Sequence, residues 1–417
     1  MLKGLLLAGI GMVAPHAAEA QDAVSSAALP TNVSIAQRAR PDYDPIGGRI
    51  GSFFLYPRLD LTGYYTSNLR AQDNNDAISD VFLDVRPSAR LASVWSRHSL
   101  QADVYYARTV HANYPREDFS QYGGNVTGRY DIGRSGFASL TANAARIAEP
   151  RTDINSNLAS RSPITYLNLS ASGQVSQDFA RFGVSVSGGL NKQTFDNGTT
   201  FSGLPLSQEF RDNTNYNGQV EGRYRLGANT RLLARVGGGG IRYDINPFNG
   251  FDRDSNFYRV EGGVGLTFSE LLSGSVTAGF YRQDNADPRF LDSSGLSFSA
   301  DLLYSPTALT SVRLTADRTV EPGGSTITSG NVRGTGAVTV EHELRPDLIL
   351  IGNARYSHVE PQGAIPGADE YGGSASALYY LSRRFRFNAS VGYSARSSDF
   401  FPKFNAVIAS AGVTVTL

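Results

Sequence analysis

Residues 216–226 read Tyr216-Asn217-Gly218-Gln219-Val220-Glu221-Gly222-Arg223-Tyr224-Arg225-Leu226. Apolar and aromatic side chains alternate here with polar and charged ones, and this period of two is typical of a β-strand. One face is apolar and the other carries charge, so the two faces must meet different solvents. The same pattern recurs in 258–268, 312–317 and 385–393.

The alternating runs extend well past ten residues, whereas strands of soluble proteins average about six residues. Tilted membrane strands need that extra length. Eight short connections alternate with nine longer, more polar ones, near 70–77, 113–117, 150–162, 196–212, 245–255, 285–292, 322–328, 361–369 and 399–403. We therefore predict an all-β fold, a transmembrane antiparallel β-barrel of about 18 strands with both termini periplasmic.

Composition supports a large sheet and excludes several other classes. The 417 residues include 44 glycines and 11% aromatics, which suit a pleated sheet better than helices. Acidic and basic residues number 38 each, so nucleic acid is not an expected partner. The absence of cysteine excludes disulfides, thiolate metal sites and an acylated N-terminal cysteine.

The N-terminus has the pattern of a cleavable Sec signal. Lys3 precedes the apolar run Leu5 to Val13, and Ala18-Glu19-Ala20 is a small-x-small cleavage site. We predict a signal peptide at 1–20, a mobile periplasmic segment at 21–50 and an outer-membrane barrel at 51–417. The expected location is the bacterial outer membrane, with membrane lipid and the barrel assembly machinery as partners.

The strand pattern predicts charged side chains that face the lumen. Water inside a barrel tolerates such charges, and opposite charges on neighbouring strands can pair; alternatively, the arginines could contact anionic or hydroxylated solutes. No grouping of histidines with nucleophiles or ligands predicts a catalytic or metal site, and no cofactor is expected. The candidate lumen residues are Asp103, Arg129, Glu221, Arg223, Arg225, Arg259, Glu261, Arg313, Asp317, Arg333, Arg384 and Arg386.

The stretch 40–57, Arg40-Pro41-Asp42-Tyr43-Asp44-Pro45-Ile46-Gly47-Gly48-Arg49-Ile50-Gly51-Ser52-Phe53-Phe54-Leu55-Tyr56-Pro57, carries a family resemblance. It is similar to the opening of the second β-barrel porin family of Gram-negative outer membranes. Weaker matches lie at 95–100, 130–134, 253–255, 305–307 and 340–344. Members of that family are often associated with capsule or exopolysaccharide secretion loci, and no binding residues are transferred from them.

The resemblance implies a non-enzymatic channel, the outer-membrane passage for an exported exopolysaccharide. A periplasmic polysaccharide export protein and a polysaccharide or sugar solute are the partners that it implies. One alternative is a general or sugar-selective diffusion porin with a long loop folded inward, against which the modest loop 196–212 argues. Another is a structural or adhesive barrel.

Overall fold

The structure of the protein is a computed structural model that describes residues 33–246, 250–268 and 271–417. The expected signal peptide at 1–20, and residues 21–32 of the segment expected to follow it, lie outside the described residues. Within the described part of the chain, no helix is long and apolar enough to cross a membrane.

Strands make up almost all of the described chain, and its helical turns are single 3-10 turns. The strands are β1 (Gly48–Ile50), β2 (Phe53–Thr66), β3 (Asp80–Ser93), β4 (Ser99–His111), β5 (Phe119–Ile132), β6 (Gly136–Ala148), β7 (Thr165–Asp178), β8 (Phe182–Phe195), β9 (Gly198–Thr199), β10 (Pro205–Leu206), β11 (Asn213–Arg225), β12 (Thr230–Tyr243), β13 (Ser255–Phe268), β14 (Leu272–Asn285), β15 (Ser293–Thr307), β16 (Thr310–Glu321), β17 (Thr328–Arg345), β18 (Leu348–Gly363), β19 (Ala368–Tyr380), β20 (Phe385–Ser398) and β21 (Phe404–Thr416). The 3-10 turns are η1 (Ile35–Gln37), η2 (Asn74–Asp76), η3 (Pro115–Glu117) and η4 (Glu209–Arg211).

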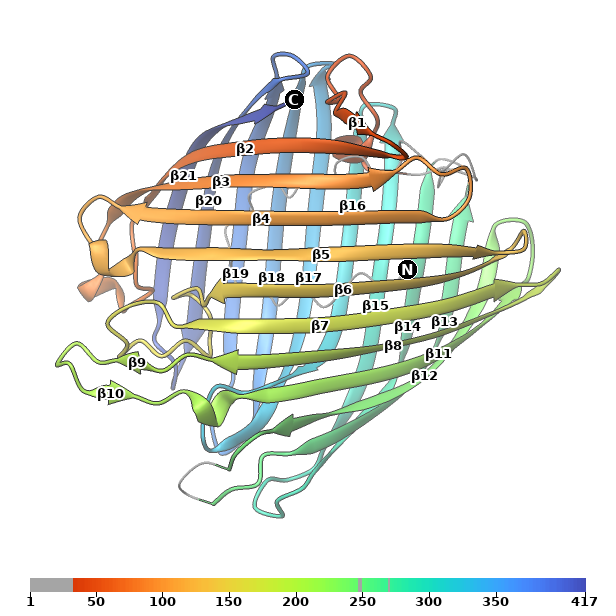
Figure 1. Cartoon of the computed structure of the whole chain (residues 1–417). Coiled ribbons are helices and arrows are strands. Elements are labelled where there is room, and N and C mark those ends of the chain that lie inside the picture. Colours follow the sequence, from red (N-terminus) through yellow and green to blue (C-terminus); the bar gives the residue numbers. More distant parts are fainter. Residues whose placement is uncertain (1–32, 247–249, 269–270) are drawn as a thin grey trace.

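The main sheet closes into a barrel. Each long strand pairs antiparallel with its neighbour along the chain, and β2 pairs with both β3 and β21. The short β1 pairs only with β2 and stays outside the ring, which leaves 18 strands of the 19-stranded sheet in the closed wall. Figure 1 shows this wall, with β2 to β12 crossing in front of the more distant strands. The predicted antiparallel barrel is confirmed.

The strand register places apolar side chains outside. In β8, Val184 and Val186 are 43% and 52% exposed, whereas Ser185 between them is 5% exposed. The outward positions of the other strands carry Val, Leu, Phe and Tyr in the same way, which is the surface that a lipid bilayer requires. The alternation predicted from residues 216–226 is therefore the alternation between lipid and lumen.

Short turns gather at one end of the barrel and longer loops at the other. Both ends of the described chain approach the short-turn end, where the Gly47 amide donates to the Leu417 carbonyl at 3.3 Å. The turn between β15 and β16 is short, residues 308–309, because β15 continues to Thr307 through a register shift after Tyr304. The location of this end in the periplasm remains a prediction.

Candidate functional site

The lumen is the candidate site, and its wall is polar. On β7, the inward Asn168 is 7% exposed, while the flanking Leu167 and Leu169 are 38% and 43% exposed on the outer face. The same inward face continues with Ser170, Ser172, Gln174 and Ser176, and the next strand contributes Asn191 and Gln193. Amide and hydroxyl groups such as these can donate and accept hydrogen bonds with a hydrated solute.

Every predicted lumen charge except Arg384 lies on a barrel strand; Arg384 lies in the turn before β20 and is exposed. Several of the others form ion pairs across neighbouring strands. Asp103 accepts from Arg90 at 2.7 Å, and Glu221 accepts from Arg235 at 2.7 Å. The remaining partners are Asp131 for Arg129, Asp178 and Glu221 for Arg223, Gln219 for Arg259, Thr277 and Ser297 for Glu261, Asp301 for Arg313, and Glu321 and Glu370 for Arg333.

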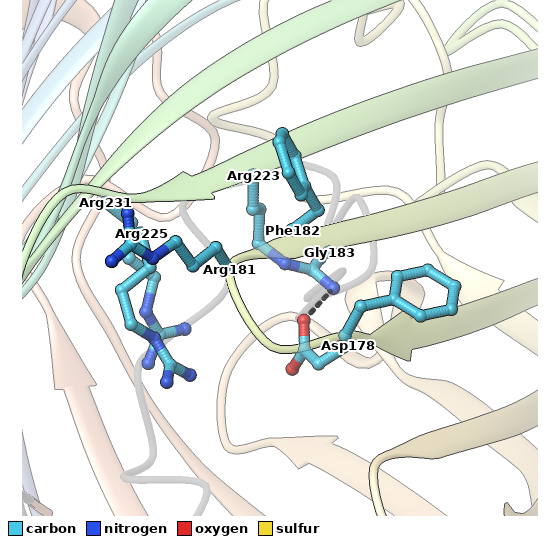
Figure 2. A pocket seen from close by; sticks show the side chains of 8 residues that line it. Asp178, Arg181, Phe182, Gly183, Arg223, Arg225 and Arg231 are labelled. Atoms are coloured by element: carbon cyan, nitrogen blue, oxygen red, sulfur yellow. Dashed lines mark hydrogen bonds and ion pairs between the residues drawn. The ribbon is translucent and has the colours of Figure 1, made fainter.

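Three predicted residues have different surroundings. Asp317 on β16 is half-buried, and Arg386 on β20 is 8% exposed with its guanidinium 5.8 Å from the centre of the Tyr380 ring. Arg225 ends β11 and is exposed, beside Arg181, Arg223 and Arg231 (Figure 2). The structure therefore disperses the predicted charges along the lumen and does not gather them into one site.

The densest ionic network lies towards the long-loop end. The Glu370 carboxylate of β19 accepts hydrogen bonds from Arg333 of β17 and Arg396 of β20, the latter at 3.0 Å. Arg333 also donates to Glu321 of β16 at 3.0 Å. Arg333, Glu370 and Arg396 are each less than 5% exposed. Buried charges persist only when they are paired in this way.

The loop between β6 and β7, residues 149–164, crosses the lumen to reach this network. Seven strands separate β6 and β7 from β17 and β18 in either direction around the ring, so the two pairs stand on opposite walls. Yet Ile154 packs against Val359 and Ala368, and Arg396 donates to the Thr152 carbonyl. The Asn155 side-chain oxygen accepts from the Gly324 amide at 2.8 Å and from the Asn331 amide at 3.2 Å.

Other loops hold this crossing loop in place. Glu149 at its start accepts from Arg211 of η4, and Arg151 donates to Glu117 of η3 at 3.0 Å. Arg70 donates to the same Glu117 carboxylate at 2.8 Å. We call the segments 67–79, 112–118, 149–164, 196–212, 244–246, 250–254 and 322–327 together the loop cap.

Arg253 ties the loop cap to the wall without a carboxylate partner. Its guanidinium donates to three backbone carbonyls, at 2.9, 2.8 and 2.6 Å, and lies 3.8 Å from the centre of the Tyr243 ring. The carbonyls belong to Thr328, Phe210 and Gly323. The side chain is fully buried, and its burial lowers its pKa. One residue thus joins three segments that are distant in the sequence.

Asp153 of the crossing loop faces groups of both signs. Burial and the neighbouring Glu149 carboxylate raise the pKa of Asp153 to about 6, although the Asn155 amide and Arg333 favour its charged form. Glu370, Arg211 and Tyr166 also lie within electrostatic range. The loop cap therefore contains a carboxyl group that titrates near neutral pH.

The opposite, short-turn end is occupied by residues 33–45, which we call the N-terminal anchor. Ile35 is fully buried against Ile349, Leu378 and Tyr380, and Tyr43 packs at the edge of this cluster. These contacts lie within the segment 21–50, whose mobility stays a prediction. Burial of an isoleucine side chain stabilises such a contact by about 1.5–3 kcal/mol.

Polar contacts complete the N-terminal anchor. Ser34 and the Ala36 amide donate to the Glu341 carboxylate at 3.1 and 2.8 Å, and Arg40 donates to Glu343 at 2.6 Å. Both glutamates lie on β17, the strand that also carries Arg333 of the long-loop network. Strand β17 therefore supports obstructions at both ends of the lumen.

Sequence reasoning did not find Glu341, Glu343, Glu370, Arg396 or the crossing loop. The sequence holds a partial signal for Glu341 and Glu343. Both alternate with the apolar Val340, so the pattern predicts that their carboxylates face inward. Basic residues available to pair with them occur at 38 and 40. No local pattern in 149–164 shows that this loop crosses the barrel. Among the described residues, no three His, Asp or Glu side chains are grouped so that they could hold a metal ion.

The family described as "Putative beta-barrel porin 2" matches residues 40–417, nearly the whole described chain. The chain belongs to this porin family. The predicted resemblance is confirmed, and the protein is an outer-membrane β-barrel porin. Such porins are in general not enzymes. No curated protein has a detectably similar sequence.

Solved structures similar to this porin are outer-membrane barrels. OpdK from Pseudomonas aeruginosa is 10% identical over 87% of this chain and 99% of its own, with a TM-score of 0.43. OccK3 (OpdO) from the same organism is 12% identical over 87% and 96%, with a TM-score of 0.45. The siderophore receptor PiuA from Acinetobacter baumannii is 8% identical over 89% and 82%, with a TM-score of 0.47. At these identities, nothing about their solutes transfers to this chain.

Proposed function

We propose that this porin is the outer-membrane passage for an exported exopolysaccharide. The observation that carries the proposal is a polar lumen obstructed at each end by the chain's own segments, the loop cap and the N-terminal anchor. A ring of 18 strands encloses a lumen wide enough for an aqueous channel. A wide passage that opens only during export needs obstructions of this kind, because a permanently open one would leak.

The lumen wall suits a sugar polymer. Serine, asparagine and glutamine line the inner faces of β7, β8 and β11, and arginines of β11 stand among them. Sugar hydroxyls both donate and accept, so they can exchange hydrogen bonds with successive wall groups as the polymer advances.

Both obstructions can move without breaking the wall. The loop cap is held to the wall by side-chain contacts such as Arg396 with the Thr152 carbonyl and Asn331 with Asn155, whereas the wall is held by backbone ladders between strands. Displacing the cap therefore leaves every strand pairing intact. At the short-turn mouth, a periplasmic polysaccharide export protein would engage or displace the N-terminal anchor.

The first test is genetic. Deletion of the coding sequence should abolish secreted polysaccharide and leave outer-membrane integrity unchanged, with a complemented strain as control. Surface and periplasmic polysaccharide are both measured. Unchanged secretion in the deletion strain overturns the export proposal.

A second test traps the loop cap. Because the chain has no cysteine, Asn155→Cys with Asn331→Cys offers a single tether between crossing loop and wall, at side chains whose amides are 3.2 Å apart. Oxidation should stop polymer secretion and reduction should restore it. Asn155→Cys alone is the matched control and should secrete normally in both conditions.

A diffusion porin is the second candidate, and the crossing loop 149–164 favours it. The modest length of loop 196–212 argued against a diffusion porin with an inward loop. A different loop, 149–164, crosses the lumen, so that argument does not apply. Liposome swelling with neutral sugars distinguishes the two functions. Rapid, size-dependent uptake together with normal polymer secretion in the deletion strain would support the diffusion porin.

A further inference from the structure

Three arginines stand side by side at the short-turn mouth. Arg181 lies in the turn between β7 and β8, Arg225 ends β11, and Arg231 lies at the start of β12. The Arg225 amide donates to the Arg181 carbonyl at 2.8 Å, and Arg225 is the direct register partner of Arg231. Figure 2 shows the side chains of these three residues, which we call the rim cluster, gathered on one side of the pocket.

The strand register directs two members of the rim cluster towards the lumen. On β11, Glu221 and Arg223 face inward and Val220 faces outward with 49% exposure, so Arg225 shares the inward face. On β12, Arg235 faces inward to Glu221 and Leu232 faces outward with 44% exposure, so Arg231 also lies on the inward face. The turn that carries Arg181 adds the third guanidinium beside them.

The rim cluster lacks compensating charge. The acidic residue that lines the pocket, Asp178, accepts instead from Arg223 at 2.9 Å. Within the described residues, Arg181, Arg225 and Arg231 form no side-chain hydrogen bond or ion pair. Like charges directly opposite each other on paired strands are destabilising, and Arg225 and Arg231 occupy such positions.

The arginines elsewhere in this half of the lumen differ. Arg90, Arg129 and Arg313 are each paired with an aspartate at 2.5–2.8 Å. Arg181, Arg225 and Arg231 thus place three unpaired guanidiniums on adjacent segments at this mouth. The planar guanidinium matches carboxylate and phosphate groups, to which it can donate two parallel hydrogen bonds.

We propose that the rim cluster is a binding site for an oxyanion, a carboxylate or phosphate group, carried by the solute in the lumen. The site makes the short-turn mouth selective for anionic solutes. Together with the proposed export function, on which this step rests, the site identifies the exported polymer as an acidic polysaccharide. The positions of Arg225 and Arg231 on the lumen face favour a solute over a lipid headgroup.

The test uses the purified, full-length mature porin in detergent, with sodium galacturonate and inorganic phosphate as probes. We expect Arg181→Gln with Arg225→Gln and Arg231→Gln to weaken binding of at least one probe, measured calorimetrically, by tenfold or more. The matched control is Arg90→Gln with Arg129→Gln and Arg313→Gln, which removes the same charge from paired positions and should weaken binding by less than threefold. Heat-modifiable migration on gels verifies that both variants fold.

Several outcomes overturn the site. Equal losses in the two triple variants would mean that net charge alone attracts the probes, and undiminished binding in the rim variant would exclude the rim cluster. If the rim variant loses binding only to phosphatidylglycerol vesicles, measured against phosphatidylcholine vesicles, the rim cluster binds lipid headgroups and not a solute in the lumen.

The polymer phenotype is independent of this result. Normal secretion in the deletion strain overturns the export function while the oxyanion site stands on its binding data. Loss of secretion with wild-type probe binding in the rim variant overturns the site alone.

Discussion

The two ends of the lumen are obstructed by different kinds of contact. The loop cap is held by buried ion pairs and hydrogen bonds: Arg151 pairs with Glu117, and Arg396, which pairs with Glu370 of the wall, donates to the Thr152 carbonyl. The N-terminal anchor is held by an apolar cluster around Ile35, with Arg40 and Glu343 at its edge. Charged contacts depend on protonation and on exact partners, whereas apolar contacts depend mainly on buried area. The two ends should therefore respond to different perturbations.

Removal of the crossing loop should have the largest effect. Replacing residues 151–161 by a short Gly-Ser linker should raise single-channel conductance several-fold, because this loop is what spans the lumen between opposite walls. Planar bilayer recordings measure it. The matched control replaces the exposed residues Ser202, Gly203 and Leu204 and should leave conductance within about 20%. Unchanged conductance after loop removal would show that the cap does not obstruct the channel.

Glu370→Gln should come next. It leaves the buried Arg396 guanidinium without a carboxylate, and Arg333 with Glu321 as its remaining carboxylate; breaking a buried pair costs about 3–5 kcal/mol. We expect more frequent opening in bilayers and a lower unfolding temperature. Asp301→Asn is the control, because the Asp301–Arg313 pair is partly exposed at 47% and 25% and such pairs contribute about 0–1 kcal/mol. Equal effects of the two substitutions would contradict the central role assigned to Glu370.

Acidity should tighten the loop cap. The pKa of Asp153 is raised to about 6 in the folded cap, above its usual value near 3.9, so the closed cap binds the proton more strongly than the open one. Stability of the closed cap is therefore greatest below the open-state pKa near 3.9 and is lost as pH rises towards the closed-state pKa of about 6. Open probability should increase from pH 5 to pH 7.5.

Asp153→Asn is the matched test of this dependence, since it preserves shape and removes the titration. At pH 7.5, the open probability of the variant should be as low as that of the native porin at pH 5. A variant that keeps the native pH profile would assign the titration to another group, with Glu149 as the next to examine.

The N-terminal anchor should give the smallest change in conductance. Ile35→Ala removes buried methyl groups, a change that typically costs 2–5 kcal/mol in a packed core, and should release the anchor to limited proteolysis. Conductance should rise by less than twofold, and the pH profile of the loop cap should not change. Altered pH dependence in Ile35→Ala would mean that the two ends are coupled through β17.

Residues 216–226 show why the barrel could be predicted from sequence. Val220 and Arg223 sit on opposite faces by parity alone, and the lipid and the lumen impose opposite requirements on those faces. Connections could be sorted into turns and loops because their lengths alternate. The same parity rule misplaces residues beyond strand ends, as with Arg384 in its turn.

Aromatic residues show a limit of the same reasoning. Tyr379 and Tyr380 are adjacent at the end of β19, and neighbours on a strand face opposite sides. Tyr380 therefore enters the lumen and packs with Ile35 and Tyr43 of the N-terminal anchor. Composition alone does not say which of two adjacent tyrosines faces lipid.

By itself, the sequence determined the strands, their two faces, the closed membrane barrel and the family. The strands, their faces and the barrel follow from period-two patterning, which each strand carries locally, whereas the stretch 40–57 indicates the family. Only the tertiary structure decided that 149–164 crosses to the opposite wall, that Glu370 joins Arg333 to Arg396, and that three arginines meet at the short-turn mouth. Each of these depends on closure of the ring, which brings together residues that are up to hundreds of positions apart and that no local pattern connects.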